Sequence, residues 1–196
     1  MQKRRSTKIS KSTKNFKFNL RYIKAVAVWT SKVAAVCLLA FVFVWFLGQQ
    51  VSTVGDSMKP ALQNGDVVLV NRVVYNATTP KRGDVIVFKP KGNDNIHYYM
   101  KRVIGLPGDE IVIDNDGYVY INGYLLEEPY ISDRGLGECD IEFPFTVPEN
   151  TYFLMGDHRS TSIDSRSTVI GCIPTEQIVG KLFFRVWPLN DFAILH

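Results

Sequence analysis

The chain has 196 residues, of which 46% are hydrophobic and 21% are charged, and its formal net charge is +4. This length suits one domain with room for a small insertion. The three cysteines and three histidines form no cluster with zinc-ligand spacing, so we expect no metal and no cofactor.

The first 55 residues carry ten Lys or Arg and no acidic residue, whereas the rest carry thirteen Lys or Arg against nineteen acids, a net −6. A basic block can be a nucleic-acid-binding arm. Here a hydrophobic segment follows directly, which favours a membrane-topology signal. We therefore expect no nucleic-acid partner and a basic cytoplasmic tail over residues 1–24.

Residues 33–47 contain no polar side chain, and residues 25–31 are mostly apolar, with Lys32 between them. A helix over residues 25–48 would be ~36 Å long at ~1.5 Å per residue, enough to cross a bilayer core of about 30 Å. Lys32 would then snorkel toward the head groups, unless the span begins at Val33. We predict one transmembrane anchor over residues 25–50.

The excess of basic residues before the anchor predicts a cytoplasmic N-terminus, with the following residues outside. A cleaved secretory signal is the alternative, but the basic region is long and no clean small-x-small site follows the apolar run. Cys139 and Cys172 would lie outside, where thiols can oxidise. Whether they pair is open at this stage, because their separation in space is unknown.

After residue 54, short segments rich in Val, Ile, Tyr and Phe alternate with turn dipeptides such as Asn122-Gly123. No convincing amphipathic helix follows residue 62, although residues 175–179 can form one turn. The predicted strands cover residues 67–70, 84–88, 100–104, 110–113, 118–121, 152–155 and 183–186.

This pattern predicts a mostly β fold, a barrel-like antiparallel β domain over residues 51–196 behind the single helix. Residues 124–126 would pair with residues 118–121 in a hairpin. Residues 115–150 are rich in acidic and turn-forming residues. We interpret them as a small inserted β subdomain.

Ser57 lies ten residues after the apolar run, in the segment Gly55-Asp56-Ser57-Met58-Lys59-Pro60. The glycine and proline indicate a constrained loop that can aim a backbone N–H at an oxyanion. A serine hydroxyl needs a base to become a nucleophile. His97 and His158 are candidate bases, and so is a lysine that burial keeps neutral.

Lys101 follows two tyrosines and a methionine on a predicted strand and is followed by Arg102. Side chains alternate along a strand, so one of these two basic residues points inward. An inward lysine must be neutral or paired. The alternative is a surface strand with both bases solvated.

Residues 156–166 read Gly-Asp-His-Arg-Ser-Thr-Ser-Ile-Asp-Ser-Arg. Two Asp and two Arg so close together can satisfy one another in a solvated loop. The functional interpretation is a set of side chains that holds a nucleophile and its base in place. Ser162 can exchange a hydrogen bond with the lysine.

Together these segments resemble bacterial type I signal peptidases of the Ser/Lys kind. The family's Ser-Met-x-Pro box is similar to Ser57-Met58-Lys59-Pro60, and its lysine box to residues 99–109. Its second box resembles residues 64–70 and 82–88. Residues 156–166 match its Gly-Asp-Asn-Arg-x-x-Ser-x-Asp-Ser-Arg box except at His158, where the family usually has Asn.

The resemblance implies that Ser57 is the nucleophile, Lys101 the general base, and Ser162 the residue that orients Lys101. The Ser57 N–H would form half of the oxyanion hole, and Gly55 occupies the position where some members add a serine hydroxyl. The implied supporting residues are Asp157, Arg159, Asp164 and Arg166. The implied pockets for substrate residues −1 and −3 are lined by Val54, Met58, Leu62, Tyr99 and Met100.

The implied activity is that of a membrane-bound serine endopeptidase. It would cut signal peptides from secretory preproteins after Ala-x-Ala-like sites, through an acyl-enzyme, on the outer face of the cell membrane. We expect a monomer in contact with membrane lipid. The alternatives are a catalytically silent, membrane-anchored assembly factor of the same fold, and a Ser/Lys self-cleaving protease.

Overall fold

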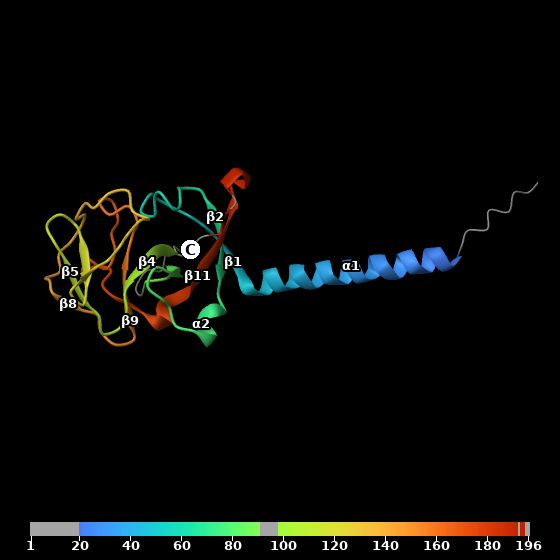
Figure 1. The fold of residues 1–196 in the computed structure, drawn as a ribbon, viewed down its shortest axis with the longest axis horizontal. Helices are drawn as coiled ribbons and strands as arrows, with labels where there is room; N and C mark the ends of the chain where they lie inside the picture. Colours follow the sequence, from blue (N-terminus) through green and yellow to red (C-terminus); the bar gives the residue numbers. More distant parts are fainter. Residues whose placement is uncertain (1–19, 91–97, 192, 195–196) are drawn as a thin grey trace, which may run out of the picture. The chain divides into compact units, whose positions relative to one another are not determined.

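The computed structural model describes residues 20–90, 98–191 and 193–194, and it falls into two units, Met1–Phe43 and Val44–His196. Helix α1, Leu20–Leu47, makes up the described part of the first unit and ends four residues beyond it (Figure 1). Its segment Tyr22–Val42 has a mean hydropathy of 2.0, and its side chains are exposed. By length and composition the helix can cross a membrane. A signal sequence near an N-terminus has the same length and composition.

The predicted apolar helix is therefore present, with different ends. It begins at Leu20, before the expected Ala25, and it stops at Leu47. Residues 48–50, which we had included in the anchor, belong to the first strand of the second unit.

The second unit is antiparallel β in every strand pairing that the described residues make. Its large sheet has the order β1-β2-β11-β3-β4-β9-β10, with β12 beside β11. These strands are β1 (Gly48–Ser52), β2 (Val67–Asn71), β3 (Val85–Phe88), β4 (Tyr99–Gly105), β9 (Thr151–Met155), β10 (Ile173–Pro174), β11 (Ile178–Trp187) and β12 (Ala193–Ile194).

A smaller sheet has the order β7-β6-β5-β8 and lies at the end of this unit away from β1 and β2 (Figure 1). It comprises β5 (Glu110–Ile113), β6 (Val119–Ile121), β7 (Tyr124–Leu125) and β8 (Phe145–Thr146). The short helical turns are α2 (Val74–Ala77), η1 (Thr175–Gln177) and η2 (Leu189–Asp191). Three strands of the smaller sheet, β6, β7 and β8, lie within residues 115–150, the expected inserted β subdomain, whereas β5 lies just before that region.

The mostly β prediction is confirmed, and all seven predicted strands are present. The predicted hairpin is also present, with Asn122 and Gly123 at φ 52° and 82° between β6 and β7. The large sheet is curled, but it is not a closed barrel in the described part of the chain, because β1 and β10 remain its edges. Strand β1 was not predicted because Gln49 and Gln50 interrupt the alternation of apolar and polar residues by which strands are recognised.

Strand β4 carries the candidate base into the middle of the large sheet, between β3 and β9. Its side chains alternate as expected: Met100 packs in one buried cluster with Val87, and Val103 in another with Ile86. We expected one of the two basic residues to point inward, but both are buried. Lys101 and Arg102 are 3% and 4% exposed, because both faces of this strand are covered.

Two glycines of the smaller sheet offer a matched test of local packing. Gly117 and Gly123 have φ of 80° and 82°, but a Cβ at Gly117 would lie 1.7 Å from the Arg134 carbonyl oxygen, whereas one at Gly123 would meet nothing within 4 Å. We expect Gly123→Ala to lower the free energy of unfolding by about 1–2 kcal/mol through backbone strain alone. Gly117→Ala should cost roughly 1–3 kcal/mol more. Equal losses of unfolding free energy for the two variants, measured by denaturant unfolding, would contradict the close packing of Gly117 against the Arg134 carbonyl.

Candidate active site

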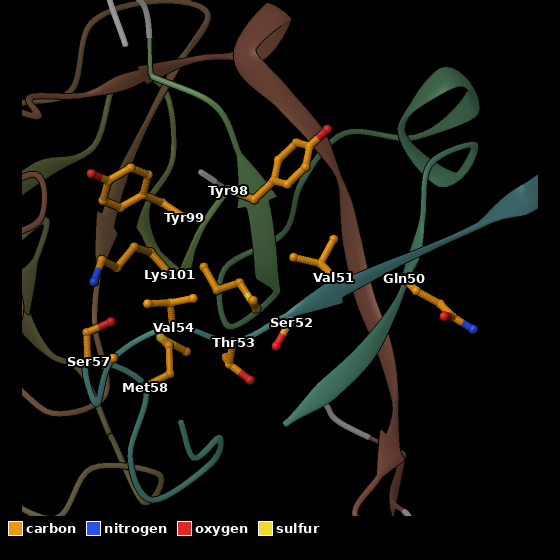
Figure 2. A pocket seen from close by; sticks show the side chains of 12 residues that line it. Gln50, Val51, Ser52, Thr53, Val54, Ser57, Met58, Tyr98, Tyr99 and Lys101 are labelled. Carbon is orange, nitrogen blue, oxygen red and sulfur yellow. The ribbon is translucent and has the colours of Figure 1, made fainter. Parts of the chain in front are cut away.

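A cavity of about 450 Å³ lies between the segment that follows α1 and the start of β4. Residues 50–55, 57 and 58 line one side, and residues 98–101 line the other. Figure 2 shows Ser57 and Lys101 at one end of this cavity and Gln50 at the opposite end. The cavity therefore joins the two segments that the sequence singled out, which are 44 positions apart in the chain.

The Ser57 loop is held at the serine and directly after it. The Ser57 carbonyl oxygen accepts a hydrogen bond from the His158 N–H at 3.1 Å, and the neighbouring Met58 is buried in the core with Leu62. Within the described residues the Ser57 N–H has no partner, so it can donate to a substrate oxygen. The Gly55 N–H is already bonded to Asn64 Oδ1 at 3.2 Å.

Lys101 is buried, and no carboxylate in the described part of the chain lies within ion-pairing distance of its Nζ. Burial lowers its pKa to about 8 from an ordinary value of 10.5. The Asp164 and Asp157 carboxylates oppose this shift, and the Arg166 guanidinium adds to it. A useful fraction of Lys101 is therefore neutral near pH 8, as a general base requires.

Residues 156–166 are not a solvated loop. Asp157 and Asp164 are fully buried, and Arg159, Ser162 and Arg166 are each 1% exposed. The charges are matched by hydrogen bonds of good geometry. Asp157 accepts from Arg102 Nε at 2.8 Å, and Asp164 accepts from Arg166 Nε at 2.8 Å. Burial alone would raise the pKa of Asp164, but the Arg166 bonds outweigh it and hold that pKa low.

Gly156 brings this block against the nucleophile loop. A Cβ at Gly156 would lie 2.5 Å from the Ser57 carbonyl oxygen and 2.3 Å from Ser162 Oγ. Ser162 Oγ is itself buried with no hydrogen-bond partner of good geometry in the described residues. Ser57, Gly156 and Ser162 thus pack together with no space between them.

The structure brings together most of the residues predicted for substrate binding. Val54, Met58, Tyr99 and Met100 line the cavity, with Val54 80% exposed. Leu62 does not line it and lies in the core behind Met58. Sequence reasoning missed residues 50–53 and Tyr98, which also line the cavity. Strand β1 was not predicted, and only Val51 gave an apolar signal.

Sequence reasoning also missed Glu128, which pairs with Arg159 in the buried interior. Its position in Glu127-Glu128-Pro129 indicated only an acidic surface turn. The expectation that the two Asp and two Arg of residues 156–166 pair only with one another was therefore incomplete. Arg159 pairs with Glu128, which lies outside this block.

The histidine alternatives are placed as follows. His97 lies outside the described residues. His158 donates its backbone N–H to Ser57, but its side chain does not line the cavity.

Cys37, Cys139 and Cys172 are all free thiols, so the possible disulfide is not formed, and burial raises the pKa of Cys172 to about 11. No group of His, Cys, Asp and Glu in the described segments could hold a metal.

Comparisons with known proteins agree on one family. The family model described as signal peptidase, peptidase S26, matches residues 26–187. Signal peptidase IB of Staphylococcus aureus is 34% identical over 184 residues, covering 86% of this chain and 93% of the relative. Signal peptidase I S of Bacillus subtilis is 35% identical over 181 residues, covering 88% and 95%.

A solved structure is also similar, the crystal structure of a signal peptidase I from Enterococcus faecalis V583. It is 31% identical in sequence, with a TM-score of 0.45, and the match covers 54% of this chain and 97% of that one.

Proposed function

Because the chain belongs to the signal peptidase family, peptidase S26, and is a serine endopeptidase, we propose that it cleaves secretory preproteins after Ala-x-Ala-like sites with Ser57 and Lys101. The observation that carries this proposal is the cavity that Ser57 shares with a buried lysine lacking a carboxylate partner in the described residues. A serine and a neutral amine at one end of a cleft supply the nucleophile and the base that acyl transfer requires.

In the proposed reaction, neutral Lys101 Nζ takes the proton of Ser57 Oγ while that oxygen attacks the scissile carbonyl carbon. The Ser57 N–H donates to the oxyanion that develops. Gly55 offers no side-chain donor, and its N–H is used by Asn64, so the second donor must come from elsewhere. The Lys101 ammonium then protonates the departing amine of the mature protein.

This first half-reaction leaves the signal peptide as an ester on Ser57. A water that Lys101 deprotonates attacks the ester carbonyl, and the serine leaves with a proton from the ammonium. Ser162, Asp157, Arg159, Asp164 and Arg166 take no part in bond breaking in this scheme. Their burial supports a role in holding the Lys101 and Ser57 segments.

The cavity supports specificity for small side chains. Val54, Met58 and Tyr99 form walls of the cavity at the end where Ser57 lies (Figure 2), and Met100 also lines the cavity. In this proposal these side chains leave shallow pockets for substrate residues −1 and −3. In this proposal Leu62 acts from behind Met58 by filling the core under the pocket wall.

For the whole chain we propose a cytoplasmic tail over residues 1–24, an anchor over residues 25–47 and an extracytoplasmic catalytic domain that begins with β1 at Gly48, with residues 115–150 inserted. Members of the signal peptidase I family are anchored in the membrane, and the apolar helix α1 fits such an anchor. The basic residues before it favour a cytoplasmic N-terminus. The working form would be a monomer in contact with lipid.

The test is a cleavage assay with detergent-solubilised full-length protein and a preprotein whose signal ends in Ala-x-Ala. We expect a new N-terminus directly after that site, identified by sequencing the product, and none with Ser57→Ala. Cleavage by neither protein would favour the silent assembly factor. Release of a fragment of this chain instead of the preprotein would favour the self-cleaving protease.

A further inference from the structure

The buried arginines around the candidate site each contact a buried carboxylate. The three pairs are Arg102 with Asp157, Arg166 with Asp164, and Arg159 with Glu128. Lys101, equally buried, has no such partner within residues 20–90, 98–191 and 193–194. Because a buried charge is costly unless it is matched, this arrangement leaves Lys101 as the cation that can most readily lose its proton.

Glu128 differs from the other two carboxylates because it lies outside residues 156–166. It lies between β7 and β8 in the sequence, and its side chain is 2% exposed. Its two oxygens accept hydrogen bonds from both terminal nitrogens of Arg159, one of them at 3.1 Å. Such bidentate contacts fix orientation as well as charge.

Tyr130, two positions further on, completes the arrangement. Its hydroxyl donates to Glu128 Oε1 at 2.9 Å. Its ring lies under the Arg102 guanidinium, whose Cζ is 4.1 Å from the ring centroid. One short segment therefore contacts two of the three buried arginines.

Both of these arginines connect to the proposed catalytic groups. Arg102 follows Lys101 on β4. Arg159 Nε donates to the Gly156 carbonyl oxygen at 3.0 Å, and Gly156 packs against the Ser57 carbonyl oxygen. A change in either guanidinium therefore reaches the base or the nucleophile through one further contact.

We propose that Glu128 and Tyr130 are positioning residues that hold Arg159 and Arg102, and through them the Ser57 and Lys101 segments, in the reactive arrangement. This inference rests on the proposed function. Loss of the Glu128 charge would leave the Arg159 cation unmatched, which favours the neutral form of Lys101, and would loosen the Arg159 contact with Gly156.

The other charged residues near Lys101 stay in place in that experiment, although Glu128 also raises the pKa of Asp157, so the loss of its charge lowers that pKa. Asp157, Asp164 and Arg166 face it from residues 156–166, and Arg102 is its neighbour on β4. On the nucleophile loop, Asp56 and Lys59 form an exposed pair at 3.0 Å. An altered titration in a Glu128 variant therefore reports the loss of the Glu128 charge, which acts on both Arg159 and Asp157.

The experiment compares Glu128→Gln with Glu128→Asp in full-length protein, using the preprotein cleavage assay over a range of pH. We expect Glu128→Gln to lower kcat roughly ten-fold with KM changed less than about two-fold, as when an outer partner of a built site is lost. Its acid limb should move to lower pH, because an added positive charge opposes protonation of Lys101. Glu128→Asp keeps the charge and should leave the limb in place.

A purely structural role for Glu128 would lower thermal stability in both variants and leave both acid limbs at the wild-type pH, which would overturn the inference. If Glu128→Gln is not recovered folded, Tyr130→Phe decides, because it keeps the ring under Arg102 and removes the bond to Glu128. A several-fold lower kcat in this variant supports the inference, and wild-type kcat overturns it.

Failure of the inference is distinguishable from failure of the proposed function. If Lys101→Met is inactive while the Glu128 and Tyr130 variants match the wild type, the positioning role alone is wrong. If Lys101→Met cleaves normally, the Ser/Lys mechanism itself is wrong.

Discussion

Lys101→Met is expected to abolish preprotein cleavage, with kcat/KM lowered by at least about 10²–10⁴-fold, the usual contribution of a general base. Methionine keeps the apolar stem in its buried position and removes the amine, so the fold should survive. Lys89→Met is the matched control, since Lys89 is an exposed lysine at the end of β3 and outside the cavity. Full activity is expected there.

The pH dependence of the wild type provides the second half of this prediction. Lys101 must be neutral to accept a proton, and its pKa lies at about 8. Activity should therefore rise with pH through about 8 and level off above it, and it should fall about ten-fold per pH unit well below that value. A limb near the ordinary histidine pKa of about 6.5, with activity retained in Lys101→Met, would point to His158 or His97 instead.

Gly156→Ala is expected to cause a loss nearly as large, although it removes no chemical group. The added Cβ would lie 2.5 Å from the Ser57 carbonyl oxygen and 2.6 Å from Ser162 Cβ. Rotation of the Ser162 hydroxyl relieves neither of these two contacts, and the Ser57 carbonyl is backbone and is held by the His158 N–H. The nucleophile loop must therefore move, and a displacement of about 1 Å can cost roughly 100-fold in rate.

The control for this variant is Gly108→Ala. Gly108 has φ of 83°, but a Cβ there would meet nothing closer than 3.9 Å, at Glu149 Oε1. It should lose stability through backbone strain and keep its kcat. The measurement is kcat/KM together with thermal unfolding for both variants. Near-wild-type kcat/KM in Gly156→Ala would mean that the 156–166 block does not position Ser57.

Much of the fold could be predicted because its signals are local. Alternation and turn dipeptides located seven of the strands, and Asn122-Gly123 placed the hairpin between β6 and β7. The strands that escaped are too short or too polar to carry an alternating pattern, as the two-residue strand β8 and the glutamines of β1 illustrate. How far the sheet curls depends on pairing between distant strands, which no local pattern encodes.

The candidate site could be predicted less completely, for a physical reason. The motif around Ser57 and that around Lys101 are each contiguous, so their presence is visible in the sequence. Burial is not: Arg102 looked like a solvated alternative to Lys101, and it is buried because Asp157 and Tyr130 cover it. Glu128 looked like a surface acid for the same reason, since its partner Arg159 is 31 positions away.

The most direct test of the central claim is to locate the acyl group. Full-length enzyme is mixed with an Ala-x-Ala preprotein at a pH below 8, where little Lys101 is neutral, quenched in acid during a single turnover, digested and analysed by mass spectrometry. The account predicts an ester between the signal-peptide carboxyl group and Ser57, absent in Ser57→Ala. Product formation with no ester on Ser57, or with the ester on another residue, would contradict it.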